Sequence, residues 1–399
     1  MIIENPQKIK KAEILVGITS YNEAQNIGLV AQHASLGLEK YFSNKTSAII
    51  NTDNNSDDNT KEAFFNSAGQ IPKIYISTDK GFLGKGYNVY NFLLMMQKME
   101  AKAGIILEAD LKSISPQWIE KMAKPIFEGY QFLAPYYIRF ENEATITNHI
   151  VYPLIYGIFG LDLRQPLAGD FSFSGSMADW WLKQQWPKSA YGAGIDVFLS
   201  LHPLLIDSVK SGQVNLGSKI HRASKISGLN IIFNQIVETL FKIILANKHL
   251  IKDKTQVKQV EIIGDKRLSS LADLTPDYKS FKEAFFKKFE FIAEAVKGLV
   301  SKEVYKEIKA LQQGDKLLMD NDLWVKLVYD FLTAYDATDQ DISIIETLKC
   351  FYFGRVASFF EETSQYTPVQ SEKAIVEQAQ CFFENRNYFL ARQEKINAL

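Results

Sequence analysis

Short apolar runs alternate with amphipathic stretches through the first half of the chain. The runs have the length and continuous apolarity of buried strands and lie at residues 13–19, 47–53, 73–77 and 104–110. The stretches have helical spacing and cover residues 24–41, a segment from about residue 60, and a segment from the glycine loop 81–86 to about residue 102. Strands that alternate with helices in this way predict βαβ units around a mostly parallel, Rossmann-like sheet.

The pattern changes after about residue 225, where glycines and alternating β-branched residues become sparse. Apolar residues then recur at helical spacing over residues 229–247, 281–300, 304–311, 322–334 and 344–360. The charged segment 251–279 is expected to be a loop that connects helices. The predicted fold class is therefore α/β followed by a mainly α-helical C-terminal region, with domains at 1–225 and 226–399.

Net charge and the lengths of the apolar runs limit the kind of binding partner and the cellular compartment that we expect. The formal net charge of −1 argues against non-specific nucleic-acid binding, which needs a basic excess. The longest apolar run, residues 151–161, is too short for a membrane span, and the apolar stretch near the N-terminus is too short for a signal peptide. We therefore expect a cytoplasmic protein with no membrane span and no nucleic-acid partner. The aromatic-rich helical half is a candidate surface for a homodimer.

Polar residues follow the first two predicted strands. Ligands of parallel sheets bind beyond the carboxyl ends of the strands, so these residues are candidates for a binding site. Segment 19–23 (TSYNE), with Ser20, Tyr21 and Glu23, is most simply a cap of the following helix, and a nucleotide contact is the alternative. Asp53 ends the second strand, where its carboxylate could accept hydrogen bonds from a base or a ribose, although a plain polar turn explains the composition around it.

A glycine loop and a pair of carboxylates end the next two strands. Gly84 and Gly86 flank Lys85, so backbone amides and a lysine could approach a phosphate, although Walker A spacing is missing and a plain turn fits equally well. Glu108 and Asp110 lie on the same side of the fourth strand and repel each other unless a positive charge sits between them. A divalent cation that bridges a diphosphate would supply that charge, and a solvated strand end is the alternative.

Three further candidates lie between residues 165 and 222. Asp170 follows Gly169, and Asp196 precedes an apolar helix expected at 197–205, so each could be a capping aspartate beside a glycine turn. His221 follows a predicted strand, and a lone histidine in such a place is more often structural than a ligand.

Taken together, the motifs resemble those of the GT-A glycosyltransferases. The matching segments, in order, are 20–23 (SYNE), 53–58 (D-x-x-S-x-D), 84–86 (GKG), 108–110 (EAD), 166–169 (PLAG), 194–196 (GID) and 221–222 (HR). The order and the gaps are closest to retaining enzymes of the mannosylglycerate synthase and glucosyl-3-phosphoglycerate synthase type. The resemblance covers about residues 13–225, and beyond that it consists of length and helicity.

This resemblance implies a role for each matching residue. Residues expected to bind the nucleotide sugar are Ser20, Tyr21, Glu23, Asp53, Lys85, Glu108, Ala109, Gly169 and Asp170. Asp110 and His221 would hold Mg²⁺ or Mn²⁺, and Asp196, Lys85 and Glu108 would be catalytic. Arg139 and Thr147, with Asp196, would hold the acceptor. The departures from the family pattern are Thr19, Asn54, Glu108 and Ser224, where the family usually has proline, aspartate, aspartate and tyrosine.

The implied activity is retaining transfer of a hexose from GDP-mannose, UDP-glucose or GDP-glucose to a small carboxylated acceptor such as glycerate or phosphoglycerate. The alternatives are an inverting family 2-type transferase that builds a polysaccharide or glycoconjugate, a nucleotidyltransferase, and a sugar-nucleotide sensor without activity. A glycine-rich loop directly after the first strand is typical of nucleotidyltransferases, and here Gly17 is the sole glycine at that place, which disfavours that class.

Overall fold

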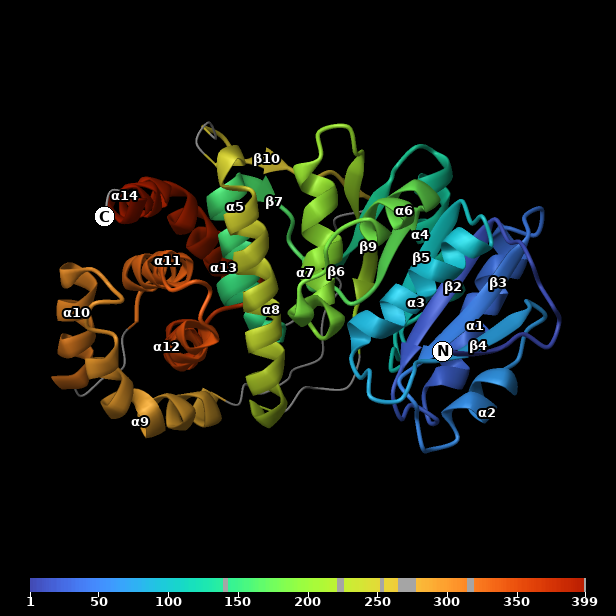
Figure 1. Ribbon diagram of the computed structural model, residues 1–399, viewed down its shortest axis with the longest axis horizontal. Coiled ribbons are helices and arrows are strands. Elements are labelled where there is room, and N and C mark those ends of the chain that lie inside the picture. Colours follow the sequence, from blue (N-terminus) through green and yellow to red (C-terminus); the bar gives the residue numbers. More distant parts are fainter. Residues whose placement is uncertain (139–142, 221–225, 252–254, 265–277, 314–318, 398–399) are drawn as a thin grey trace. The chain divides into compact units, whose positions relative to one another are not determined.

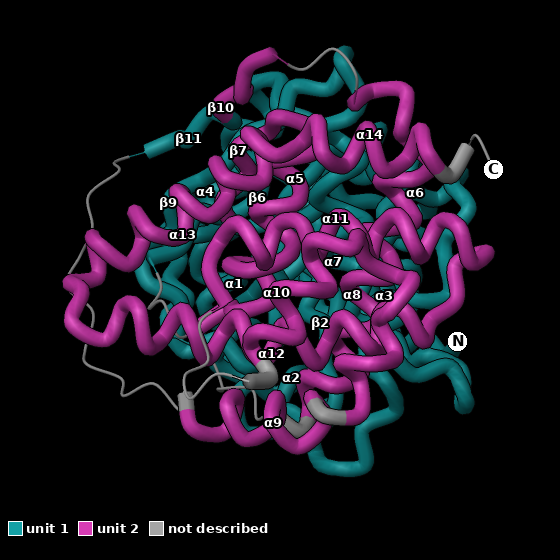
Figure 2. The backbone as a smooth tube through the Cα atoms, turned by 90° about the vertical axis from the view of Figure 1, so that its left-hand side faces the viewer, with its two compact units in different colours: residues 1–139, 165–223, 260–271 teal, residues 140–164, 224–259, 272–399 magenta. Residues whose placement is uncertain are grey.

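The computed structural model describes residues 1–138, 143–220, 226–251, 255–264, 278–313 and 319–397. The chain forms two compact units, which Figure 2 colours separately. Unit 1 contains residues 1–139, 165–223 and 260–271, and unit 2 contains residues 140–164, 224–259 and 272–399.

Unit 1 is built on a nine-stranded sheet with the order β1-β4-β3-β2-β5-β8-β6-β9-β11. Its strands are β1 Ile2–Glu4, β2 Ile14–Ser20, β3 Ser47–Asp53, β4 Lys73–Ser77, β5 Ala103–Glu108, β6 Phe132–Ile138, β8 Phe171–Ser174, β9 Ser211–Ser218 and β11 Ile262–Ile263. Strands β1 and β8 run antiparallel to their neighbours, and the other pairs are parallel. Thr19 of β2 lies in register with both Thr52 and Glu108, so the carboxyl ends of β2, β3 and β5 meet at one edge.

Helices cover both faces of this sheet (Figure 1). They are α1 Ile27–Tyr41, α2 Thr60–Phe65, α3 Lys85–Lys98, α4 Pro116–Phe127, α6 Gly175–Leu182 and α7 Ile195–Leu201, with 3₁₀ turns η2 Lys188–Tyr191 and η3 His202–Leu205. Strand β8 shows the two faces by its alternation, because the Phe173 ring packs edge-on against Phe92 of α3 while the Ser172 hydroxyl donates to the Met122 carbonyl of α4. Helix α1 packs beside α4, and α3 packs beside α6.

Unit 2 is mainly helical. Its helices are α5 Tyr152–Phe159, α8 Ile226–Ala246, α9 Tyr278–Ala295, α10 Lys302–Gln313, α11 Asn321–Ala337, α12 Ile342–Glu362, α13 Pro368–Glu384 and α14 Arg386–Asn397. A π-helical turn, η1 Thr147–Val151, precedes α5, and η4 Lys248–Leu250 follows α8. The short strands β7 Leu161–Asp162 and β10 Lys258–Gln259 pair in parallel. Within α8 the stretch Gly228–Ala246 is long and apolar enough to cross a membrane, and 44% of it is buried in the structure.

The predicted fold class, an α/β sheet region and a mainly helical remainder, is confirmed. The two units interleave along the chain, whereas the sequence pattern divides it once, near residue 225. Residues 140–164 belong to the helical unit because α5 packs on α13, where Gly157 leaves no room for a side chain against Phe382. Segment 251–279 contains the two-residue strands β10 and β11, which the loop prediction missed. A domain division at 225 stays a prediction.

Candidate active site

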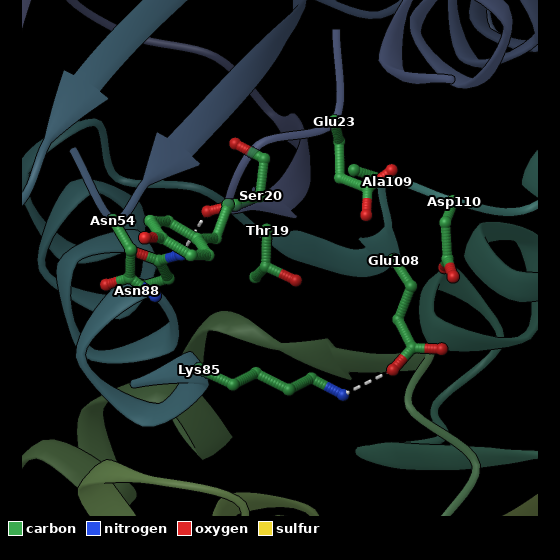
Figure 3. A pocket seen from close by; sticks show the side chains of 10 residues that line it. Thr19, Ser20, Glu23, Asn54, Lys85, Asn88, Glu108, Ala109 and Asp110 are labelled. Atoms are coloured by element: carbon green, nitrogen blue, oxygen red, sulfur yellow. Dashed lines mark hydrogen bonds and ion pairs between the residues drawn. The ribbon is translucent and has the colours of Figure 1, made fainter. Parts of the chain in front are cut away.

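A polar pocket of unit 1 lies at the carboxyl ends of β2, β3 and β5 (Figure 3). Its lining residues come from these strand ends and from the first turns of α3, and they are Thr19, Ser20, Tyr21, Glu23, Asn54, Lys85, Asn88, Glu108, Ala109 and Asp110. The aligned register of the parallel strands gathers residues that are far apart along the chain, such as Thr19 and Asn54, 35 residues apart, and Tyr21 and Asp110, 89 residues apart. Seven of the predicted site residues line this pocket together: Ser20, Tyr21, Glu23, Lys85, Glu108, Ala109 and Asp110.

The segment after β2 faces the pocket and does not cap the next helix. Helix α1 begins at Ile27, and its N-cap residue Asn26 makes no side-chain capping bond. The Asn26 amide instead donates to Glu23 Oε2 at 2.7 Å. The simpler interpretation of segment 19–23 as a helix cap is therefore wrong, because three residues separate Glu23 from the first helical residue and Glu23 lines the pocket.

Asp53 does not line the pocket but holds Ser20, which does. Its carboxylate is fully buried and accepts hydrogen bonds from the hydroxyls of Ser20 at 2.6 Å, Ser56 at 2.6 Å and Tyr75 at 3.0 Å. The adjacent Asn54 lines the pocket instead, and its buried Oδ1 has no hydrogen-bond partner among the described residues. Asn54 is thus a pocket residue that the sequence prediction passed over, although it was visible as a departure from the family pattern.

The glycines of the loop before α3 are needed for close packing. A Cβ on Gly84, whose φ is +145°, would lie 2.3 Å from the Tyr191 carbonyl oxygen, and one on Gly86 would lie 2.0 Å from that of Ala190. The loop therefore rests on η2 and places Lys85, the first residue of α3, at the pocket. Contact between these amides and a phosphate stays a prediction.

Lys85 joins two carboxylates from different elements. Its Nζ lies 2.9 Å from Glu108 Oε1 and 2.9 Å from Asp196 Oδ1, and it donates to the Gly169 carbonyl at 3.2 Å. Asp196 is in the first turn of α7, which begins at Ile195, two residues before the expected start, so Asp196 lies inside the helix and does not cap it. It reaches the site because η2 and the glycine loop hold α7 beside α3.

A second lysine, Lys219, holds the other oxygen of Glu108. Its Nζ lies 2.7 Å from Glu108 Oε2 and 2.8 Å from Asp170 Oδ2. We call the group Lys85, Glu108, Asp170, Asp196 and Lys219 the charge cluster. Lys219 was absent from the predicted site, although it directly follows β9 and strand-end position was the signal that identified the other candidates.

Gly169 and Asp170 border Glu108. Asp170 accepts a hydrogen bond from the Glu108 backbone amide at 2.9 Å and another from the Tyr137 hydroxyl at 2.6 Å. Gly169 has a φ of +84°, and a Cβ there would lie 2.4 Å from the Glu108 carboxyl carbon. The glycine is therefore required both by its backbone conformation and by the space that the Glu108 carboxylate occupies.

For two of these groups, Glu108 and Lys85, the ion pairs shift the pKa more strongly than burial does. Burial alone would raise the pKa of Glu108, but Lys219 and Lys85 hold that pKa well below its usual value, so Glu108 is ionised. Burial alone would lower the pKa of Lys85, but Asp196 and Glu108 raise it above its usual value. For Asp196 burial dominates over the attraction of Lys85 and raises the pKa. The resulting site favours the charged forms of Lys85 and Glu108 and the protonated form of Asp196 relative to an ordinary aspartate.

The described residues could hold a divalent cation only together with a ligand. Among the described residues no group of three or more His, Cys, Asp or Glu side chains could hold a metal. Both Glu108 oxygens face lysines, which leaves Asp110 and Glu23 as the other carboxylates at the pocket. Mg²⁺ is commonly bound through one or two carboxylates together with substrate phosphates, which is what this pocket offers. His221, the second predicted ligand, lies outside the described residues.

The predicted acceptor residues stay untested. Arg139 lies outside the described residues. Thr147 belongs to unit 2, where it is buried in the π-helical turn η1.

No protein-family model and no curated protein matched the sequence. Among solved structures, one similar chain is glucosyl-3-phosphoglycerate synthase from Mycobacterium tuberculosis in complex with Mg²⁺ and uridine diphosphate, with 20% identity, a TM-score of 0.47, and coverage of 58% of this chain and 79% of that one. The same enzyme with Mn²⁺, UDP-glucose and phosphoglyceric acid gives 20% identity, the same coverages and a TM-score of 0.46. A structure described as a mycobacterial protein gives 20% identity, coverages of 58% and 74%, and a TM-score of 0.48.

The chain is similar to glucosyl-3-phosphoglycerate synthase. That is one of the two enzyme types to which its motifs show a resemblance. At this identity and TM-score the likeness assigns no residue role and no substrate.

Proposed function

We propose that this protein is a retaining, metal-dependent glycosyltransferase that moves a hexose from a nucleotide-diphosphate sugar to a small carboxylated acceptor such as glycerate or phosphoglycerate. The observation that carries the proposal is the pocket at the ends of β2, β3 and β5. Its described lining combines amide and hydroxyl groups with Lys85, Glu108 and Asp110. Amides and hydroxyls suit a base and a ribose, and the charged groups suit a diphosphate and a cation.

The charge of the pocket lining suggests that a nucleotide sugar needs a cation in order to bind there. Among the described lining residues three carboxylates, Glu23, Glu108 and Asp110, stand against one lysine, Lys85. A diphosphate is itself anionic, so it would be repelled from this pocket unless a cation entered with it. Asp110, together with His221 by resemblance, would hold Mg²⁺ or Mn²⁺, which stabilises the negative charge that develops on the departing diphosphate.

The chain's own residues would orient the reacting groups. Lys85 remains protonated and donates hydrogen bonds to the phosphate that leaves. In retaining transfer on one face of the sugar, the bond from the anomeric carbon to the phosphate oxygen breaks, the bond to the acceptor oxygen forms, and the departing phosphate takes the hydroxyl proton. Asp196, which Lys85 holds at 2.9 Å, is the carboxylate proposed to lie beside the acceptor and the reacting carbon.

A transfer assay tests the proposal. UDP-glucose, GDP-glucose and GDP-mannose are each offered with glycerate or 3-phosphoglycerate and Mn²⁺, beginning with UDP-glucose and phosphoglycerate, which the M. tuberculosis enzyme binds. We expect release of nucleoside diphosphate that depends on the acceptor and, by NMR, a product that keeps the α-anomeric configuration. A β-linked product would instead support an inverting transferase, and release of pyrophosphate would support a nucleotidyltransferase. Donor binding without release would support a sensor.

A further inference from the structure

Lys219 is buried and all its donors are occupied. The side chain is 1% exposed, and its Nζ lies within hydrogen-bond distance of Glu108 Oε2, Asp170 Oδ2 and the Ala168 carbonyl oxygen, the last at 2.6 Å. An ammonium group has three N–H donors, so each has one acceptor here. Lys219 therefore has no donor to spare for a ligand and is fixed in one orientation.

The partners of Lys219 are themselves fixed. Asp170 is fully buried and receives hydrogen bonds from the Glu108 backbone amide and from the Tyr137 hydroxyl. Asp170 thus holds the backbone of Glu108 while Lys219 holds one oxygen of its carboxylate. Because Gly169 has no side chain, nothing else fills the space where that carboxylate lies.

Lys85 differs from Lys219 in what it can reach. Its side chain is 22% exposed and lines the pocket, and its two carboxylate partners come from different elements. It can therefore turn toward a phosphate, whereas Lys219 cannot. When Lys85 does so, Glu108 Oε1 is left facing the pocket and Lys219 is the cation that keeps the carboxylate in place.

We infer that Lys219 is a positioning residue, which holds Glu108 so that its other carboxylate oxygen, Oε1, faces the sugar of the bound donor once Lys85 has turned to the phosphate. This role rests on the proposed function, because it requires a nucleotide sugar in the pocket. The lysine acts through Glu108 and Asp170 and does not touch the donor itself.

The test compares affinity for a nucleotide sugar with affinity for the same nucleoside diphosphate alone. For Lys219→Met we expect turnover to fall about 30-fold or more and affinity for the nucleotide sugar to fall, while affinity for the diphosphate changes by less than about threefold. Lys219→Arg keeps the charge and should recover turnover to within about tenfold of wild type. Lys210→Met, an exposed lysine at the other end of β9, is the matched control and should behave as wild type.

If Lys219→Met alone does not fold, a double variant keeps the inference testable. Lys219→Met leaves two carboxylates without their buried cation, whereas Glu108→Gln with Lys219→Met removes one of those charges. If Lys219 acts through Glu108, the sugar-dependent affinity of the double variant should match that of Glu108→Gln within about threefold. A further loss of about tenfold or more in the double variant would overturn the inference.

The remaining outcomes separate the two proposals. A folded Lys219→Met protein that transfers sugar as wild type does would overturn this role and leave the proposed function standing. A Lys219→Met protein that loses affinity for the sugar nucleotide and the diphosphate equally would show a merely structural lysine. A wild-type protein that binds no nucleotide sugar would overturn the proposed function and the role of Lys219 with it.

Discussion

Both units bury charged side chains, but they balance the charge differently. In unit 2, Arg355 is 1% exposed and donates to Glu362, to Gln378, to Asn321 and to the Met319 carbonyl, a group we call the Arg355 network. Its single cation faces a single carboxylate, and its partners lie on α11, α12 and α13 or just before α11. In unit 1 the charge cluster sets three carboxylates against two lysines.

This difference separates a structural use of buried charge from a functional one. A balanced pair with satisfied donors fixes helices to one another and needs no ligand. An unbalanced group that opens into a pocket is stabilised by solvent, by protonation of one of its carboxylates, for which Asp196 has a raised pKa, or by a ligand that brings positive charge. Loss of charge should therefore destroy activity in unit 1 and stability in unit 2.

The largest expected effect is on activity, from Asp110→Ala. Asp110 is the proposed metal ligand that lies among the described residues. Without its carboxylate the cation would be lost, so we expect transfer to fall by about 10³-fold or more. EDTA should do the same to the wild-type protein. Asp57→Ala, which removes an exposed carboxylate from the turn after β3, is the matched control. Full activity in the presence of EDTA would refute the metal-dependent mechanism.

Arg355→Leu should affect stability instead. It leaves Gln378, Asn321 and the Met319 carbonyl without their donor. Because the Glu362 side chain is 37% exposed, solvent screens the ion pair, and we expect a cost of about 2–3 kcal/mol. The free energy of unfolding, measured with urea, should fall by that amount while turnover per folded molecule stays within about threefold. Lys373→Met, on the exposed side of α13, serves as control. A loss below about 1 kcal/mol would show that the Arg355 network is not what fastens these helices.

Lys85→Met should have the opposite effect to Arg355→Leu and reduce turnover more than stability. Loss of one charged donor at the leaving group is expected to reduce turnover by about 10²-fold. The side chain is partly exposed, so unfolding free energy should change by no more than about 1–2 kcal/mol. Lys80→Met in the preceding exposed segment is the control. A Lys85→Met protein that unfolds easily but turns over normally would contradict the contrast between the units.

A smaller effect concerns pH. Burial lowers the pKa of His149 in unit 2 to about 3, below its ordinary value of 6.5. The unfolded chain then binds a proton that the folded protein does not, so stability is lost as pH falls from 6.5 toward 3, by about 2 kcal/mol at pH 5. His149→Phe should remove that part of the decrease in urea denaturation between pH 7 and 5. An unchanged pH dependence would show that folding does not shift the pKa of His149.

The sequence pattern predicts well what local periodicity determines. Strands β3 and β4 have the predicted bounds, and β2 and β5 differ by one or two residues, because buried parallel strands are continuous apolar runs. Strand β8 has four residues, and β10 and β11 have two each. Segments this short carry no periodicity, and their pairing partners are distant in sequence, so the pattern did not identify them. The prediction also missed β6, although its seven residues form a run as long as β2 and β3.

The candidate site was likewise predicted only in part from the sequence. Strand-end position identified most pocket residues, because parallel strands bring their ends together whatever the details of the fold. It could not show that Asp53 is buried behind Asn54, since adjacent residues of a turn differ only by local geometry. Nor could it show that Lys219 and Lys85 share Glu108, because that contact depends on how β9, β5 and α3 are placed in three dimensions.

A calorimetric titration of the wild-type protein tests the central claim most directly. UDP-glucose, GDP-glucose and GDP-mannose are titrated into the protein with and without Mn²⁺. Because carboxylates outnumber lysines in the described pocket lining, we predict saturable binding of at least one donor that Mn²⁺ strengthens by about tenfold or more. Absence of saturable binding for every donor, with Mn²⁺ present, would contradict the assignment of this pocket to a nucleotide sugar.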